Sequence, residues 1–125
     1  MIYGVLGYLL NNERELLLVL RKNEPYARMW APPGGTIEKG ETPQQAVVRE
    51  VQEETALEVV VKRKIGRKLD IPEHSLSIDV FELEYISGKA NAGGDAAAVG
   101  FFQRRELHGL IIAPPVISFF KRYDL

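Results

Sequence analysis

The segment from Gly35 to Leu57 reads GTIEKGETPQQAVVREVQEETAL. It places a glycine turn before a predicted helix that carries Glu50, Glu53 and Glu54. Acids spaced i, i+3 and i+4 occupy roughly one third of the circumference of a helix, because each residue advances the helix by about 100°. We therefore expect three carboxylates on one helix face that can converge on a single metal ion.

The predicted helix has a clear beginning. Thr42 suits the N-cap, Pro43 fits the first helical position, and Gln45 completes a capping box of the form T-x-x-Q. The apolar stripe that would pack on a core consists of Val47, Val48, Val51 and Thr55. The acids lie beside this stripe on the helical wheel, which places them at the edge of a cleft.

The ligand types indicate which metal would suit the cluster. Like charges at this spacing repel, and partial burial raises their pKa values unless a cation compensates. The chain has no cysteine, and no histidine lies near the acids. Hard carboxylate oxygens favour Mg²⁺ or Mn²⁺ over zinc. A solvated acidic helix face is the alternative for three glutamates alone, and the spacing of the surrounding residues decides against it.

That spacing resembles a family signature. Gly35, Glu41, Arg49-Glu50-Val51, Glu53-Glu54 and Leu57 stand as they do in the Nudix box. The approach from Trp30 to Gly35 is also similar to the family. The segment from Gly94 to Phe102 looks like the late strand of the members called ADP-ribose pyrophosphatases.

One position departs from the signature. Ala56 stands where the family usually has glycine at the end of the helix. Glycine is common there because it tolerates positive φ, which costs an alanine about 1 kcal/mol. The departure concerns how the helix ends, since every acid of the signature is present.

The resemblance implies a fold and a reaction. The fold is an α/β/α sandwich with a mixed β-sheet between helices, formed by a single Nudix hydrolase domain over residues 1–125 with its Nudix box at 35–57. The reaction is the hydrolysis of a nucleoside diphosphate linked to another group, by attack of water on a phosphorus of the diphosphate. Divalent cations supply both charge neutralisation and an activated water for such a reaction.

The resemblance also implies a role for each residue of the site. Glu50 and Glu54 would be the main metal ligands, with Glu53 ligating directly or through water and the carbonyl of Gly34 adding a ligand. Arg49 would orient the glutamates, so that Arg49, Glu50, Glu53 and Glu54 form the catalytic set. Gly34, Gly35 and Glu41 are expected at the substrate: the glycine pair would let the backbone approach the diphosphate, and Glu41 would hold the loop to the helix.

The substrate is open between two alternatives within this chemistry. ADP-ribose is favoured, because Pro72 follows the box at a distance similar to that of a proline associated with ADP-ribose-cleaving members. The segment Gly93 to Ala98 lacks two acids that those members usually have, which leaves a nucleoside triphosphate pyrophosphatase acting on oxidised nucleotides as the alternative. A nucleotide-binding sensor without catalysis is a third hypothesis, and the retained acids weigh against it.

An additional catalytic acid from outside the box is expected, with Glu82, Glu84 and Asp95 as candidates. In the predicted strand from Leu76 to Ile86 the apolar set changes face after Val80. A β-bulge near Val80 would explain this change and would turn Glu82 and Glu84 to solvent. The sequence does not choose among the three acids.

Composition limits the partners. The 125 residues are 46% hydrophobic with a net charge of −1, and no low-complexity tail is present. These values predict one domain that binds a small nucleotide rather than a nucleic acid polymer or a membrane. Without a secretory signal or a long apolar segment, we expect a cytoplasmic protein, and a homodimer is left open.

The hydrophobic pattern predicts the remaining elements. Leu16 to Leu20 is an unbroken apolar run, which indicates a strand buried on both faces with a helix on each side. Pro114 and Pro115 open a second helix with an apolar stripe of Val116, Phe119, Phe120 and Tyr123. Further strands are predicted at 2–10, 57–64, 76–86 and 96–103.

Overall fold

A computed structural model describes residues 1–125. The strands are β1 (Ile2–Tyr8), β2 (Leu16–Arg21), β3 (Trp30–Ala31), β4 (Gly34–Thr36), β5 (Glu58–Lys64), β6 (Leu69–Ile71), β7 (Leu76–Ser87) and β8 (Ala96–Phe102). The α-helices are α1 (Pro43–Thr55) and α2 (Pro114–Arg122), and two short 3₁₀ segments are η1 (Pro72–His74) and η2 (Arg104–Gly109). Neither α-helix is long and apolar enough to cross a membrane.

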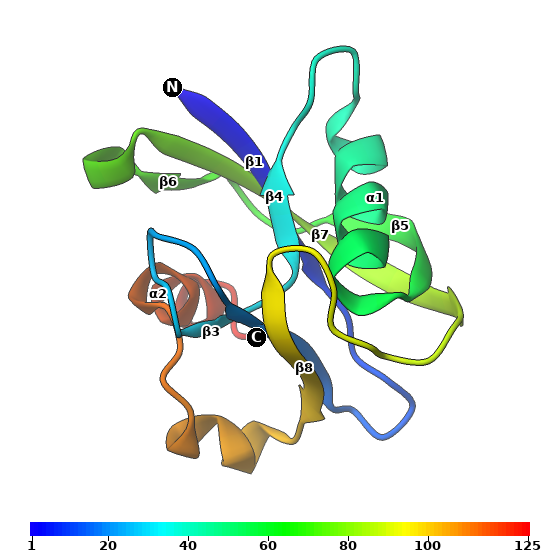
Figure 1. Ribbon diagram of the computed structural model, residues 1–125. Coiled ribbons are helices and arrows are strands. Elements are labelled where there is room, and N and C mark those ends of the chain that lie inside the picture. Colours follow the sequence, from blue (N-terminus) through cyan, green and yellow to red (C-terminus); the bar gives the residue numbers. More distant parts are fainter.

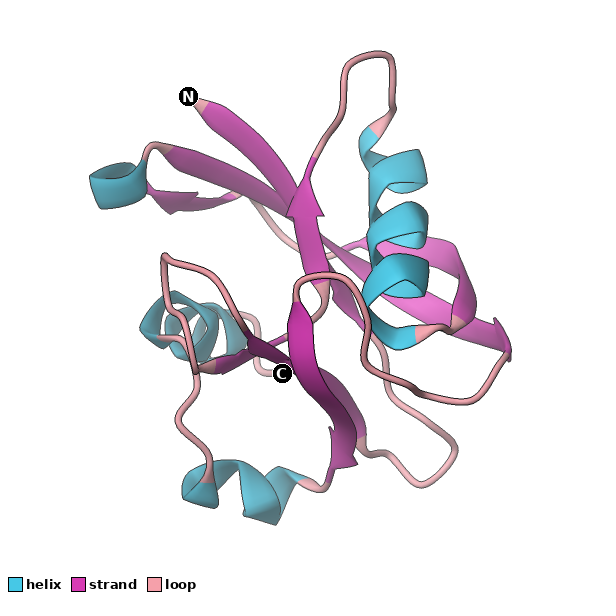
Figure 2. Ribbon diagram, in the orientation of Figure 1, coloured by secondary structure: helices cyan, strands magenta, loops and turns pink.

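The strands form two sheets between the helices (Figures 1 and 2). The larger sheet has the order β4-β1-β7-β5, with β6 pairing on β7, and β1 and β7 are its parallel pair. The smaller sheet is antiparallel in the order β3-β2-β8. Helix α1 lies on one side of this assembly and α2 on the other. The predicted α/β/α sandwich with a mixed sheet is therefore confirmed, and its division into two sheets is a feature that the sequence did not indicate.

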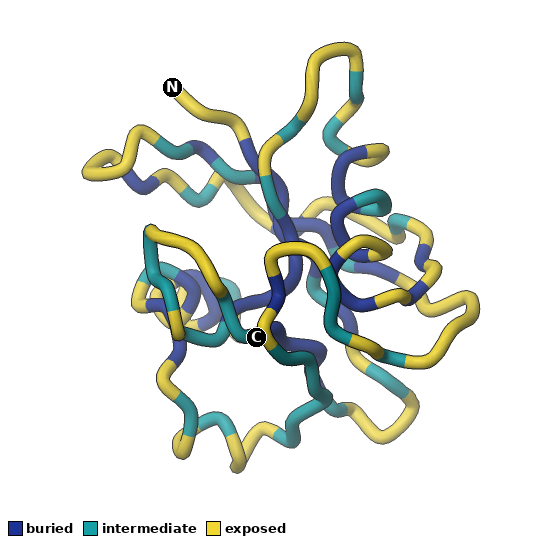
Figure 3. Tube along the Cα trace, viewed as in Figure 1, coloured by how far each residue is buried: buried dark blue, intermediate teal, exposed yellow.

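Strand β2 explains why both sides need a helix. Leu16 to Val19 are all buried, as predicted from the unbroken apolar run. Leu16 and Leu18 belong to the core that α2 covers through Val116, Phe119 and Phe120. Leu17 belongs to the core under α1, with Val47 and Val51. Figure 3 shows these buried segments running through the middle of the molecule.

The beginning of α1 follows the predicted capping box. Thr42 Oγ1 accepts a hydrogen bond from Gln45 N at 3.1 Å, and Gln45 Oε1 accepts one from Thr42 N at 2.9 Å. Pro43 occupies the first turn, where its missing N–H has no cost. At the other end, Ala56 takes φ 64° and donates its N–H to Gln52 O. The alanine thus adopts the left-handed conformation that glycine usually supplies at this position.

The bulge predicted near Val80 is wrong. Strand β7 pairs with β1 in unbroken register from Leu76 to Glu82, and the irregularities lie instead where β7 pairs with β5. The apolar set changes face because β7 passes between the two cores. Val80 packs in the core under α2, while Phe81 and Leu83 pack in the core under α1.

Candidate active site

The site lies where α1 faces the short strand β4. Glu50 and Glu54 are on the buried side of α1, with relative exposures of only 8% and 5%. Glu54 Oε1 accepts a hydrogen bond of 2.9 Å from the backbone N–H of Gly34. A β-carbon on Gly35 would lie 2.6 Å from the carboxylate of Glu50. The two acids therefore lie against the glycine strand that precedes the helix in sequence.

Gly34 and Gly35 are glycines for reasons of packing. A β-carbon on Gly34 would lie 1.9 Å from the carbonyl oxygen of Val5 on the neighbouring strand. Neither residue has positive φ, so conformational freedom is not what requires them. The two glycines bring β4 close to β1 on one side and to Glu50 on the other. Both residues line the cleft that also contains Glu50 and Glu54, called the main cleft below. The structure thus lets the two glycines position the acids, in addition to the predicted approach of the diphosphate.

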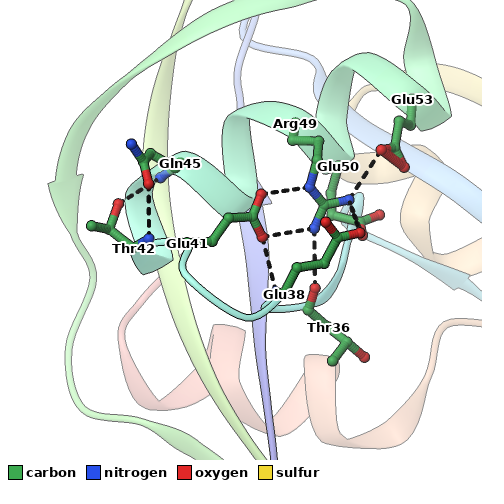
Figure 4. A network of polar contacts seen from close by, with 8 residues as sticks. All are labelled: Thr36, Glu38, Glu41, Thr42, Gln45, Arg49, Glu50 and Glu53. Carbon is green, nitrogen blue, oxygen red and sulfur yellow. Dashed lines mark hydrogen bonds and ion pairs between the residues drawn. The ribbon is translucent and has the colours of Figure 1, made fainter.

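Arg49 holds the surroundings of the acids together (Figure 4). Its guanidinium pairs with both oxygens of Glu41, with Nε to Oε2 at 2.6 Å and Nη2 to Oε1 at 3.0 Å. Nη1 donates to Glu50 at 2.9 Å and to Glu53 at 3.0 Å, and Nη2 also donates to the carbonyl of Thr36 at 3.2 Å. These carboxylate partners raise the pKa of Arg49, which stays charged at every accessible pH.

Glu41 connects this network to the preceding loop. Its Oε1 also accepts a hydrogen bond from Glu38 N at 2.9 Å, and hydrogen bonds from Arg49 and that N–H hold the pKa of Glu41 below its usual value. Glu41 does not line the main cleft. Its geometry thus corresponds to a residue that ties the loop to the helix, as the family resemblance implies.

The third acid of the helix is placed differently from the other two. The side chain of Glu53 is 51% exposed and turned toward Arg49. No three carboxylate, histidine or cysteine side chains in residues 1–125 are gathered around one metal position. The three carboxylates therefore do not converge in this arrangement as the helical spacing predicted. The physical reason is that different groups hold them: the N–H of Gly34 holds Glu54, whereas Arg49 holds both Glu50 and Glu53.

Asp95 is the acid from outside the helix that reaches the same place. It lines the main cleft with Glu50 and Glu54, and its negative charge contributes to raising the pKa of both. Glu82 is bound instead by Arg63 at 2.7 Å and by Lys62 at 3.6 Å, and it lines another cavity, as does Glu84. Of the three candidates, the structure brings only Asp95 into the cleft.

The loop before β8 explains how Asp95 is held. Asn91 N and Gly93 N donate to the carbonyls of Thr55 and Glu54, at 2.9 and 3.1 Å, so this loop closes the last turn of α1. Gly93 cannot carry a side chain there, because a β-carbon would lie 2.7 Å from the carbonyl of Glu53. From the other side, Asn23 Nδ2 donates to Asp95 Oδ1 at 3.0 Å.

The electrostatics of the site follow from burial. Desolvation raises the pKa of Glu54 to about 7, against the lowering effect of the Gly34 N–H, and the charge of Glu50 adds to the rise. Burial also raises the pKa of Glu50, and Arg49 partly opposes it. Two desolvated carboxylates side by side in a cleft make a donor set that a hard divalent cation would fit.

The main cleft extends from these acids across the face of the larger sheet. Its volume is about 470 Å³. Five acids line it, and Arg21 is the one cationic side chain in its lining. The remainder of the lining is largely apolar, with Ile2, Leu69, Ile71, Leu76, Ile78 and Val116. The end of the cleft at Glu50 and Glu54, its acidic end, could hold a metal ion and a phosphate, and its apolar part could receive another group.

Comparison with known proteins is consistent with this geometry. A family model described as the NUDIX domain matches residues 2–118. The chain has the fold of the MutT protein from Methanosarcina mazei Go1, with a TM-score of 0.85 at 24% identity over 98% of this chain and 92% of the other. The chain therefore belongs to the Nudix hydrolase family.

Two curated relatives differ in their described activities. An ADP-ribose pyrophosphatase from Methanocaldococcus jannaschii is 41% identical over 103 residues, which cover 79% of this chain and 60% of the relative. A putative 8-oxo-dGTP diphosphatase from Bacillus subtilis is 40% identical over 63 residues, covering 50% of this chain and 40% of the relative. The chain thus spans less than two thirds of the length of either relative.

Proposed function

We propose that the chain is a divalent-cation-dependent pyrophosphohydrolase that cleaves a nucleoside diphosphate linked to a second group, with ADP-ribose as the favoured substrate. The observation that carries the proposal is the pair Glu50 and Glu54, buried side by side at the acidic end of a cleft. Such a pair is unfavourable without a cation, because burial and mutual repulsion both oppose ionisation.

Each residue of the site has a task in this proposal. Glu50 and Glu54 would hold Mg²⁺ or Mn²⁺, with Glu53 joining by rotating away from Arg49 or by binding through water. The bound cation would neutralise charge on the diphosphate and lower the pKa of an attacking water. Arg49 fixes the positions of Glu50 and Glu41, and Asp95 is the additional acid that faces the reacting group from the loop before β8.

Two observations favour ADP-ribose over a nucleoside triphosphate. The relative described as an ADP-ribose pyrophosphatase matches a longer part of this chain than the 8-oxo-dGTP diphosphatase does. In addition, Arg21 is the one cation in a cleft that five acids also line: Glu24, Glu38, Glu50, Glu54 and Asp95. A diphosphate with an uncharged sugar needs less cationic compensation than a triphosphate does.

A hydrolysis screen tests the proposal. The protein is incubated with ADP-ribose, dGTP, 8-oxo-dGTP, a dinucleoside polyphosphate and NADH, each with Mg²⁺, Mn²⁺ or a chelator. We expect cation-dependent conversion of ADP-ribose to AMP and ribose 5-phosphate with the highest kcat/KM of the set, and none by Glu54→Gln. A higher kcat/KM for 8-oxo-dGTP would replace the substrate assignment, and turnover that persists in the chelator would overturn the proposal.

A further inference from the structure

The loop between β2 and β3 brings an aromatic side chain to the apolar part of the cleft. Tyr26 lines the main cleft, and it also lines the adjoining cavity of about 580 Å³, so it lies at the junction of the two. The edge of its ring meets His74 of η1, with ring centroids 5.4 Å apart and an interplanar angle of 82°. Tyr26 thus contacts η1 with the edge of its ring.

The backbone at Tyr26 is strained. Its φ is 66°, a left-handed conformation that bulky side chains rarely adopt. Two hydrogen bonds hold the residues on either side of Tyr26. Arg21 Nε donates to the carbonyl of Pro25 at 3.0 Å, and Ala27 N donates to Glu24 Oε1 at 3.0 Å. Strain of this kind persists where the surroundings over-determine it, and it is concentrated at binding sites.

The sheet opposite Tyr26 presents an apolar surface that no helix covers completely. Ile2 pairs with Leu76 and Gly4 pairs with Ile78 in the parallel register of β1 and β7, while Ile71 of β6 pairs with Leu76. Ile2 is 47% exposed, and Leu76 and Ile78 are only partly buried. Gly4 leaves the centre of this surface without a side chain. A flat surface of this kind can receive a planar apolar group.

We infer that Tyr26 stacks on the nucleobase of the substrate, above a floor formed by Ile2, Leu76 and Ile78. The inference rests on the proposed function, because it places the diphosphate at Glu50 and Glu54 and the nucleoside farther along the same cleft. Arg21 lines the same cleft as Glu50 and Glu54, and its Nε donates to the carbonyl of Pro25, next to Tyr26. One side chain thus links the cleft that holds the acids with the loop that carries Tyr26. Aromatic stacking also tolerates different bases, since every base has a π-face.

Binding of AMP and of ribose 5-phosphate separates base recognition from phosphate recognition, and neither compound has an anhydride to cleave. Calorimetry with Mg²⁺ should show that AMP binds the unmodified protein more tightly than ribose 5-phosphate does. Tyr26→Ala should weaken AMP binding about tenfold or more, the usual contribution of one stacked base. It should leave ribose 5-phosphate binding unchanged. Tyr26→Phe should bind AMP normally, and Tyr85→Ala serves as a matched tyrosine removal outside this cleft.

A second variant distinguishes binding from a structural role. Tyr26 also packs against the core that α2 covers, so Tyr26→Gly removes packing as well as the strain at φ 66°, and it should weaken AMP binding as Tyr26→Ala does. If Tyr26 only packs on the core, Tyr26→Gly changes the melting temperature and leaves AMP binding intact, which overturns the inference. Equal binding of AMP and ribose 5-phosphate by the unmodified protein would also overturn it.

Kinetics keep this inference separate from the proposed function. With ADP-ribose as substrate, Tyr26→Ala should raise KM and leave kcat close to that of the unmodified protein. If Tyr26→Ala cleaves ADP-ribose with the same KM as the unmodified protein, the proposed function stands and the inference about Tyr26 is wrong. If AMP binding depends on Tyr26 but no nucleotide is cleaved, the inference stands and the proposed function is wrong.

Discussion

Gly35 lies so close to Glu50 that a β-carbon on the glycine would be 2.6 Å from the carboxylate of the acid. Glu50 cannot move freely to relieve such a contact, because Arg49 holds Oε1 at 2.9 Å and the side chain is buried. The position of Glu50 thus depends on the absence of a side chain at Gly35 on the facing strand β4.

Gly35→Ala is therefore expected to displace Glu50 and to impair activity. The added methyl group meets the end of a side chain rather than backbone, so the fold should survive while the carboxylate shifts. We expect a fall in kcat of tenfold or more, since small misplacements of catalytic groups are costly. Steady-state kinetics and a thermal melt measure the two effects. Gly109→Ala, where nothing lies within 4 Å of the new β-carbon, is the control. Normal turnover by Gly35→Ala would show that the position of Glu50 is not critical.

Protonation of Glu54 should affect the stability of the metal-free protein. Burial raises its pKa from 4.5 to about 7, so the folded state binds a proton between these pH values that the unfolded state has released. The free energy of unfolding must then fall as pH rises from about 4.5 to about 7, by an amount on the order of 3 kcal/mol. Urea unfolding in the presence of a chelator at pH 5 and pH 8 measures the change.

Glu54→Gln is the control for this pH dependence. Glutamine has no proton to lose and keeps an oxygen for the Gly34 N–H, so the variant should show a smaller dependence and greater metal-free stability at pH 8. Added Mg²⁺ should stabilise the unmodified protein more at pH 8 than at pH 5, because the cation competes with the proton. An unchanged pH dependence in Glu54→Gln would exclude Glu54 as its source.

Arg49→Lys should lower kcat with little change in KM. Lysine keeps the charge but has no planar fork, so it cannot pair with both oxygens of Glu41 while it also holds Glu50 and Glu53. Loss of a residue that orients metal ligands typically reduces activity by roughly 10- to 100-fold. Initial rates over a range of substrate concentrations separate the two constants. A large rise in KM with normal kcat would instead make Arg49 a substrate ligand.

Ala56→Gly should stabilise the protein. Ala56 has φ 64°, which costs about 1 kcal/mol or more in a residue with a β-carbon, and part of the gain is offset by the greater freedom of glycine in the unfolded chain. We expect a net gain of up to about 1 kcal/mol in the free energy of unfolding, from urea denaturation with an unchanged m-value. Ala97→Gly, in an exposed position of β8, should lose stability by comparison. A loss in both variants would show that Ala56 is not strained.

Local sequence signals predicted the parts of the site that depend on local interactions. The capping box of Thr42 and Gln45 lies within one helical turn, and the burial of Leu17 and Leu18 follows from the apolar run itself. The spacing of Glu50 and Glu54 correctly predicted that they share a helix face at the edge of a cleft. The same spacing could not show that Glu53 would pair with Arg49 and stay half exposed, since that depends on which partners the folded chain brings together.

The remaining features depend on contacts between distant segments. The change of face in β7 suggested a bulge, whereas its cause is the passage of one strand between two cores. Asp95 reaches the cleft because Asn91 and Gly93 bind the end of α1, and no local pattern signals those hydrogen bonds. No local pattern singles out Tyr26, because its left-handed backbone and its contact with His74, which is distant in sequence, are visible only in the folded chain.

Asp95→Asn tests which acid from outside the helix takes part in the reaction. Asparagine keeps the oxygen that accepts from Asn23 Nδ2, so the substitution removes a negative charge and leaves the loop in place. If Asp95 contributes to cation binding or to activation of the attacking water, kcat should fall by roughly 10²-fold or more. The concentration of Mg²⁺ that gives half-maximal activity should also rise.

Glu82→Gln is the matched control, because Glu82 is paired with Arg63 and Lys62 outside the cleft. Exposed pairs of this kind contribute less than about 1 kcal/mol to stability. A large loss in Glu82→Gln with normal activity in Asp95→Asn would reverse the assignment, and it would show that the cleft rearranges to bring β7 to the substrate.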